Sequence, residues 1–116
     1  MKNMARRRER YMRDEVPTRL GGLAANLARA RSASQNSLNE KVVFSLFEES
    51  KFFIEWTAAE TSLETAEELV ELQIQLAIRQ RSLHSIWNSE DRRNEIASFS
   101  ASWSDRILKR SGLLNQ

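Results

Sequence analysis

Residues 42–56 are Val42-Val43-Phe44-Ser45-Leu46-Phe47-Glu48-Glu49-Ser50-Lys51-Phe52-Phe53-Ile54-Glu55-Trp56, and nine of these fifteen side chains are large and apolar. On a helix with about 100° per residue, the apolar positions cover roughly 280° of the circumference. A helix at the surface of a globular protein needs an apolar stripe of only somewhat more than 100°. The stretch therefore predicts a central helix that is covered on several sides, within its own chain or partly by a second molecule.

The rest of the chain also favours helices. Its 116 residues include only one proline and three glycines, and no segment has the strict apolar–polar alternation of a half-buried strand. We predict an all-α fold in which residues 16–116 form one domain. Its helices are expected at about residues 17–32, 37–57, 61–87 and 90–110. Because short connections between long amphipathic helices favour antiparallel neighbours, the predicted architecture is an antiparallel four-helix bundle.

Local signals support these helix boundaries. Pro17 suits the first turn of a helix, Ser37 and Glu40 have the spacing of a capping box, and Gly112 follows the last helix as a C-terminal cap. A turn at residues 57–61 is favoured over one continuous helix of nearly 50 residues. The pair Gly21-Gly22 indicates either a close approach of another backbone or a weak point in the first helix.

Residues 1–15 are predicted to form a basic N-terminal arm. Residues 1–13 carry a charge of +5, from Glu9 and from Lys2, Arg6, Arg7, Arg8, Arg10 and Arg13. The few apolar residues of the arm, Met1, Met4, Tyr11 and Met12, are too sparse to define an amphipathic face. We therefore expect the arm to be helical only when docked and its deletion to leave stability nearly unchanged, with Met12 as an alternative start.

Charge is sorted along the chain although the net charge is only +2. Residues 40–71 carry −7 and residues 79–110 carry +3, which is typical of complementary solvated helix faces. Cysteine is absent, and no segment has the length of a signal peptide's apolar region or of a membrane span. These features predict a cytoplasmic protein without a transmembrane segment.

The sequence lacks the usual signatures of catalysis and of metal binding. Its single histidine excludes the common carboxylate–histidine di-metal site of helical bundles, and it has no glycine-rich phosphate loop or nucleophile elbow. The glutamates of the third helix are expected to form a solvated acidic ridge; they are Glu60, Glu64, Glu67, Glu68 and Glu71. We predict a non-catalytic protein without a cofactor or a metal site.

Two single residues stand out from this pattern. Glu49 falls between Phe53 and Trp56 on an apolar helix face, where an unpaired carboxylate would be costly. It is expected either to reach water at the rim or to pair with an arginine, with His84 or with a group of a partner chain. His84 is interpreted as a polar residue at a helix seam rather than as a general base.

The width of the apolar arcs predicts a partner. The second and third helices each have an apolar arc of well over 200°, more than two neighbours in a bundle require. We expect the excess surface to be buried against a protein partner, most economically in a homodimer. The interface residues predicted on this basis are Phe44, Phe52, Trp56, Leu69, Leu76, Leu83 and Trp87. The alternative is a monomer in which the arm and Leu113-Leu114 cover that surface.

The arm suggests a second function. Arg6, Arg7, Arg8 and Arg10 are suited to contact with nucleic-acid phosphates or with another anionic surface. No recognition helix follows them, and a basic tail is more often a solvated chain end. Nucleic-acid binding is therefore the alternative to the prediction of a helical protein-interaction or regulatory protein that self-associates.

Three segments carry a resemblance. Residues 16–29 (VPTRLGGLAANLAR), residues 49–57 (ESKFFIEWT) and residues 103–108 (WSDRIL) are similar to small uncharacterised helical proteins of cyanobacteria. The resemblance spans about residues 13–114. It implies a cytoplasmic or thylakoid-adjacent setting and no activity.

Overall fold

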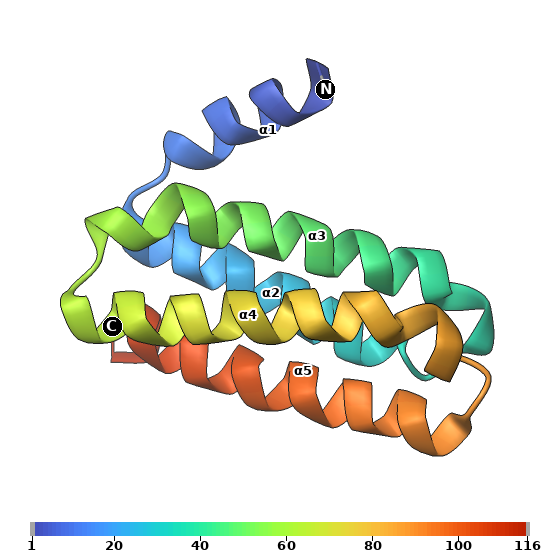
Figure 1. Ribbon diagram of the computed structural model, residues 1–116. Coiled ribbons are helices and arrows are strands. Elements are labelled where there is room, and N and C mark those ends of the chain that lie inside the picture. Colours follow the sequence, from blue (N-terminus) through green and yellow to red (C-terminus); the bar gives the residue numbers. More distant parts are fainter. Residues whose placement is uncertain (1, 116) are drawn as a thin grey trace.

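The computed structural model describes residues 2–115 and the side chains of residues 4–114. Within that range the chain is all-α, without strands (Figure 1). The helices are α1 (Lys2–Met12), α2 (Val16–Ala33), α3 (Glu40–Thr57), α4 (Leu63–Ile86) and α5 (Glu90–Ser111). Single turns of 3₁₀ helix occupy Ser37–Asn39, Ala58–Glu60 and Leu113–Asn115. The predicted all-α bundle is confirmed, but the described chain has five α-helices rather than four, because residues 2–12 are also helical.

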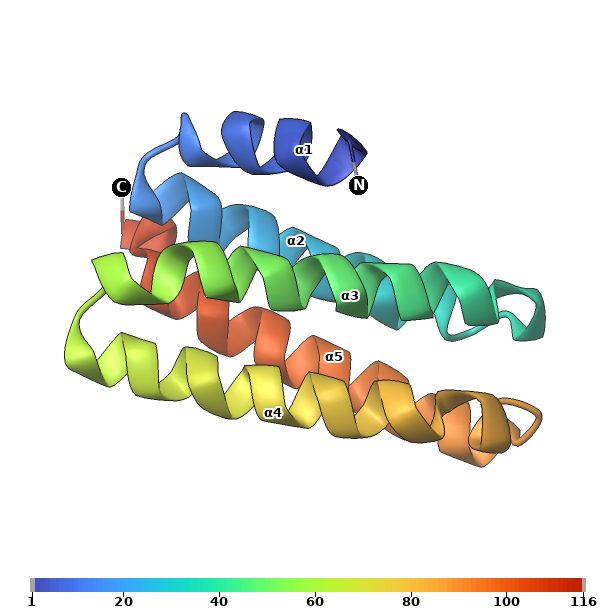
Figure 2. The same ribbon diagram turned by 45° about the horizontal axis from the view of Figure 1, so that its top comes forward.

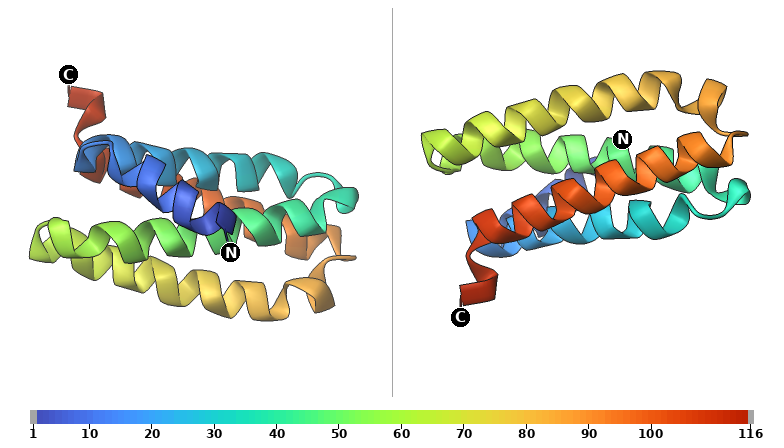
Figure 3. Two further views of the ribbon diagram at one scale, coloured as in Figure 1. Left: turned by 90° about the horizontal axis from the view of Figure 1, so that it is seen from above. Right: turned by 90° about the horizontal axis from the view of Figure 1, so that it is seen from below.

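The helices α2, α3, α4 and α5 lie lengthwise side by side, whereas α1 packs on the outside (Figure 2). Seen from above, α1 lies over the line along which α2 and α3 meet (Figure 3). The C-terminal 3₁₀ turn lies beside the beginning of α2 in the same view. The C-terminal turn and the end of α1 therefore lie near the start of α2, whereas the N-terminal end of α1 lies over the middle of the bundle.

The closest packing is between α2 and α5, and small residues explain it. The buried face of α2 includes Ala24 and Ala30, and that of α5 includes Ser100 and Ser111. Small side chains let the two backbones approach, and the hydroxyl of Ser104 donates a hydrogen bond of 2.8 Å to the carbonyl oxygen of Ala24. Larger residues fill the remaining core between these helices: Leu20, Leu23, Leu27, Ile96, Trp103 and Ile107.

Residues 42–56 form most of α3, and their apolar side chains lie on several sides of it. Val43, Phe47 and Ile54 are buried in the core. Phe53 and Trp56 are partly buried on another side, beneath α1. The prediction that this helix is covered from more than one direction is confirmed.

Serine side chains cap the starts of two α-helices, α4 and α5. Ser62 accepts a hydrogen bond from the backbone N–H of Thr65 at the start of α4, and Ser89 caps α5 in the same way. Gly112 ends α5 in the left-handed conformation at φ 76°, as predicted. The predicted capping box at Ser37 is not formed, because Asn36 caps the 3₁₀ turn instead.

Helix α1 docks on the bundle mainly through Tyr11. Its ring stacks on that of Phe53 with centroids 4.0 Å apart, and the phenol donates a 2.7 Å hydrogen bond to the carbonyl oxygen of Arg19. The hydroxyl of Thr57 lies 3.3 Å from the phenol oxygen. Tyr11 is 9% exposed, so α1 is helical in a docked position, as expected for the arm, and the burial of this side chain argues against the prediction that deletion of the arm leaves stability nearly unchanged. This one aromatic residue supplies the ring stack and the hydroxyl contacts that join α1 to α2 and α3.

The two glycines of α2 make room for side chains rather than for another backbone. A Cβ atom on Gly21 would lie 2.7 Å from Cδ1 of Leu113, and one on Gly22 would lie 3.7 Å from Cε1 of Tyr11. Gly21 is therefore the tighter of the two positions. The predicted approach of another backbone is therefore wrong: the close neighbour of this pair is the side chain of Leu113.

Candidate interaction surface

The outer face of α4 carries a row of exposed apolar side chains. Leu63 is 76% exposed, Val70 48%, Ile74 50% and Ile78 56%. Their spacings of seven, four and four residues place them on one side of a helix, about opposite the buried leucines. Ala77 is exposed beside them. We call these five residues the α4 outer face.

The α4 outer face is not the row that the sequence analysis assigned to a partner. Of the predicted interface residues on this helix, Leu69 and Leu76 are 0% exposed, Leu83 is 1% exposed and Trp87 is 2% exposed. All four lie in the core of the chain itself, so their assignment to an intermolecular interface is wrong. The wide apolar arc of this helix did not distinguish the side that faces the bundle from the outer side.

Polar contacts hold this orientation of α4. The amide of Gln73 donates to the carbonyl oxygen of Lys51 at 3.3 Å, and the amide of Gln80 donates to that of Phe44 at 3.1 Å. The indole N–H of Trp87 donates to the carbonyl oxygen of Ser37 at 2.6 Å. These contacts to α3 and to its preceding turn fix which side of α4 faces the core.

Ion pairs to α5 hold the other side of α4. The guanidinium of Arg110 donates two hydrogen bonds to the carboxylate of Glu68, at 3.1 and 3.2 Å, and Arg106 lies 3.5 Å from the same carboxylate. These contacts, led by the hydrogen bonds from Arg110, lower the pKa of Glu68. Arg110 also lies 3.7 Å from Glu64. The predicted solvated ridge is therefore partly an ion-pair network between helices.

Charge along the exposed side of α4 changes sign from one end to the other. The N-terminal half carries Glu64, Glu67 and Glu71, all exposed, and the C-terminal half carries the exposed Arg81. Glu67 and Arg81 lie seven residues before and after Ile74, which is about 10 Å along the helix in each direction. Among the residues with described side chains, neither has an oppositely charged group within 4 Å. Val70, Ile74 and Ile78 thus lie between an acidic and a basic residue, and Leu63 lies beyond the acidic one.

The three predicted interface residues of α3 lie on another part of the surface. Phe44 is 44% exposed, and its backbone carbonyl is the acceptor for Gln80, so it borders α4. Phe52 and Trp56 are partly buried, with ring centroids 5.6 Å apart. A shallow groove between α3 and α4 includes Phe52 and Ala77 in its lining. The apolar surface therefore extends from the α4 outer face towards α3.

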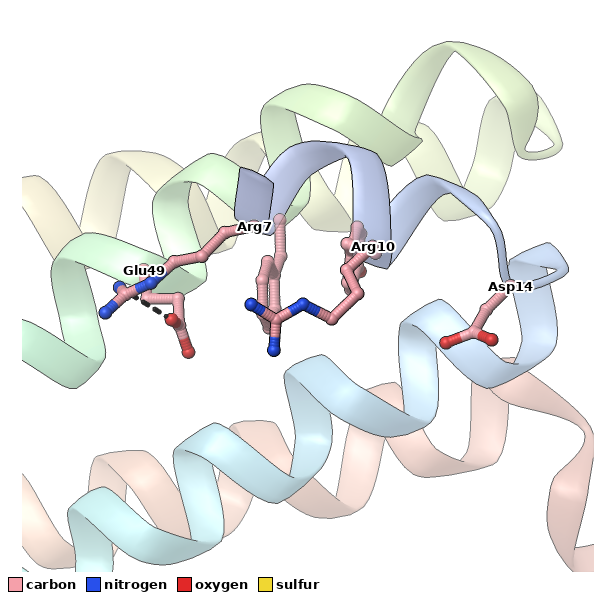
Figure 4. Close-up of a pocket in the computed structure, with 6 residues that line it drawn as sticks. Arg7, Arg10, Asp14 and Glu49 are labelled. Atoms are coloured by element: carbon pink, nitrogen blue, oxygen red, sulfur yellow. Dashed lines mark hydrogen bonds and ion pairs between the residues drawn. The ribbon is translucent and has the colours of Figure 1, made fainter. Parts of the chain in front are cut away.

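A second candidate site is the open groove beneath α1, with a volume of about 260 Å³ (Figure 4). Arg7 of α1 donates a 3.0 Å hydrogen bond to Glu49 of α3, which also accepts one of 2.9 Å from Asn26 of α2. Arg29 donates to the other side of the Asn26 amide at 2.6 Å. Of the alternatives for Glu49, the structure selects pairing with an arginine, and that arginine comes from α1.

The arginines predicted to meet an anionic surface lie on α1 and have different surroundings. All four are exposed, but Arg7 is bound to Glu49 and Arg10 lines the groove beneath α1. Figure 4 shows Arg7 and Arg10 extending from the same side of α1. Arg6 and Arg8 remain the most available for an external anion.

The other titratable groups with close partners form contacts between elements of the fold. Burial raises the pKa of the Tyr11 phenol to about 12. Arg19 is buried and donates to Glu60 at 2.7 and 3.2 Å, and these hydrogen bonds lower the pKa of the Glu60 carboxyl. His84 is exposed and its Nδ1 lies 2.8 Å from Glu40. Among the described residues, no group of three or more His, Asp or Glu side chains is placed to hold a metal ion.

Comparison with protein-family models, with curated proteins and with solved structures finds no significant match to this chain. Across residues 2–115, no helix is sufficiently long and apolar to cross a membrane.

Proposed function

We propose that this protein is a non-catalytic helical interaction protein that self-associates through the α4 outer face. The observation that carries the proposal is the row of exposed Leu63, Val70, Ile74 and Ile78 on one side of a well-packed helix. Single exposed apolar residues are ordinary, but contiguous apolar patches usually mark interaction sites. The polar contacts of α4 to α3 and α5 keep this row outside the core.

The charged residues at the two ends of the face support a second copy of the chain as the partner. A closed two-fold dimer requires a surface that is complementary to itself. Glu67 at one end and Arg81 at the other are of opposite sign, and both are exposed. The same face on a second molecule therefore offers both the apolar surface and the opposite charges.

Light scattering at micromolar concentration tests self-association. We expect a mass near twice 13.5 kDa for the natural sequence and a mass near 13.5 kDa for Ile74→Glu. The side chain of Ile74 is half exposed, so the variant should keep its helical circular dichroism. Leu38→Glu is the matched control, because Leu38 is 87% exposed but lies in the turn before α3.

A mass near 13.5 kDa for the natural sequence would contradict self-association. A dimer that persists in Ile74→Glu would show that another surface mediates it. In either case the helical core described above would be unaffected.

Nucleic-acid binding by α1 is the second candidate, favoured by the exposed guanidinium groups of Arg6, Arg8 and Arg10. Phosphate contacts of this kind depend strongly on salt. The test is retention on duplex DNA and on RNA at increasing salt, for the natural sequence and for a variant with these three arginines replaced by glutamine. Equal retention of the two proteins would contradict this function.

A further inference from the structure

The geometry points to an antiparallel pairing of α4 with α4 of a second copy, with the two-fold axis close to Ile74 and with Glu67 of each chain opposite Arg81 of the other. This inference deepens the proposed function and rests on it. It specifies which part of the partner each end of the α4 outer face meets.

The charged residues Glu67 and Arg81 lie in line with the apolar row of α4. Glu67 lies between Leu63 and Val70 on the exposed side of α4, and Arg81 follows Ile78 on the same side. Ile74 is equally far from both in sequence. A two-fold axis perpendicular to the helix at Ile74 therefore brings Glu67 of one copy to the level of Arg81 of the other.

The parallel arrangement brings like charges together. In a parallel pair, each residue lies at the level of its own counterpart, so Glu67 would face Glu67 and Arg81 would face Arg81. Like charges opposite one another disfavour pairing, whereas opposite charges steer and orient it. The antiparallel arrangement replaces two repulsive contacts by two attractive ones.

The apolar residues also meet in the antiparallel arrangement. Antiparallel pairing about Ile74 places Val70 of one chain at the level of Ile78 of the other, and the two Ile74 side chains meet at the axis. All three residues are about half exposed in the single chain, so they have surface left to bury. The charged ends would lie at the rim, where a desolvation cost is small and where charges set orientation more than affinity.

Charge reversal tests this orientation directly. An antiparallel dimer has two crossing pairs, each formed by position 67 of one chain and position 81 of the other. In the Glu67→Arg dimer both pairs are Arg–Arg, and in the Arg81→Glu dimer both are Glu–Glu. We expect each variant alone to associate about tenfold more weakly than the natural sequence, as measured by sedimentation equilibrium. When the two variants are mixed, every crossing pair is again Arg–Glu, so the mixed dimer should be favoured over both homodimers.

Native mass spectrometry separates the three dimers, because the two substitutions change the mass in opposite directions. The controls are Asp105→Arg and Arg31→Glu, which make the same charge changes at exposed positions of α5 and α2. These controls should associate like the natural sequence. Circular dichroism and urea unfolding establish that all four variants are folded.

The outcomes separate the orientation from the function. A natural sequence that dimerises, together with charge-reversal variants that each dimerise equally well alone, would overturn the antiparallel pairing and leave self-association intact, whether or not the mixed dimer is favoured. A monomeric natural sequence would overturn both. Weakened single variants with a favoured mixed dimer would establish the pairing.

Discussion

Replacement of Tyr11 by alanine is expected to lower the free energy of unfolding by about 3 kcal/mol, although Tyr11 lies on the outermost helix. Burial of a large aromatic side chain contributes about 1.5–3 kcal/mol. The stack on Phe53 adds about 0.5–1.5 kcal/mol, and the hydrogen bond to the Arg19 carbonyl adds a similar amount. Release of α1 returns part of its conformational entropy, which offsets some of this sum.

Urea unfolding followed by circular dichroism measures this change. Arg8→Ala is the matched control, since Arg8 is exposed on the same helix, and it should change stability by less than about 0.5 kcal/mol. Tyr11→Phe keeps the stacked ring and removes the hydrogen bond, so it should cost about 1 kcal/mol. A loss below about 1 kcal/mol for Tyr11→Ala would refute the docking of α1 by this residue.

Three further predictions follow from individual contacts. Burial raises the pKa of Tyr11 from 10.0 to about 12. The stabilisation by the neutral phenol should therefore be complete below pH 10 and lost as the pH rises to about 12. The absorbance of tyrosinate reports this group alone, because the chain has one tyrosine. Arg19 lowers the pKa of Glu60 below 4.5. The stabilisation by this ion pair should therefore be present above that pH and lost as the pH falls through the lowered pKa. Urea unfolding at several pH values should show a smaller acid dependence of stability for Glu60→Gln. Gly22→Ala should raise the melting temperature, because its Cβ has room and alanine favours the helix by up to about 1 kcal/mol, whereas Gly21→Ala should gain less because it displaces Leu113; an equal gain for both would contradict the tight contact at Gly21.

Much of the bundle could be predicted from helical periodicity and from turn residues. The predicted helix at 17–32 is observed at Val16–Ala33, and that at 90–110 is observed at Glu90–Ser111. These boundaries follow from local chemistry, such as the proline in the first turn and Gly112 beyond the last. Local chemistry does not depend on which helices become neighbours, so it is visible in the sequence.

The orientation of α4 was harder to predict, because both of its sides are apolar. One signal was nevertheless present in the sequence. The outer row is interrupted by Glu67 and Arg81, and burial of that row in the core would have stranded two charges. The inner row, with Leu69 and Leu76, contains no charged residue in line with it. The number of charged residues in each row therefore indicates which side of α4 faces the core, whereas the number of apolar residues does not.

The role of Tyr11 could not be predicted from the pattern of its own segment. Its partners, Phe53 and the carbonyl of Arg19, come from two other helices, and one aromatic residue among arginines defines no stripe. The same holds for Glu49, whose partners Arg7 and Asn26 lie 42 and 23 residues away. Contacts of this kind depend on tertiary neighbours and appear only when the helices are placed.

The close packing of α2 on α5 also has a consequence for how the chain folds during synthesis. These helices are the first and the last of the bundle, and the bond from Ser104 to Ala24 spans 80 residues. The apolar residues of α2 that face α5 therefore stay uncovered until α5 has left the ribosome, although α3 can already pack on another part of α2. The chain must close this long loop before α2 can pack on α5. Folding is therefore expected to be slower than in a helical protein whose contacts are mainly between successive helices. Without α5, the core residues of α2 that face it, such as Leu23 and Leu27, would be exposed to solvent.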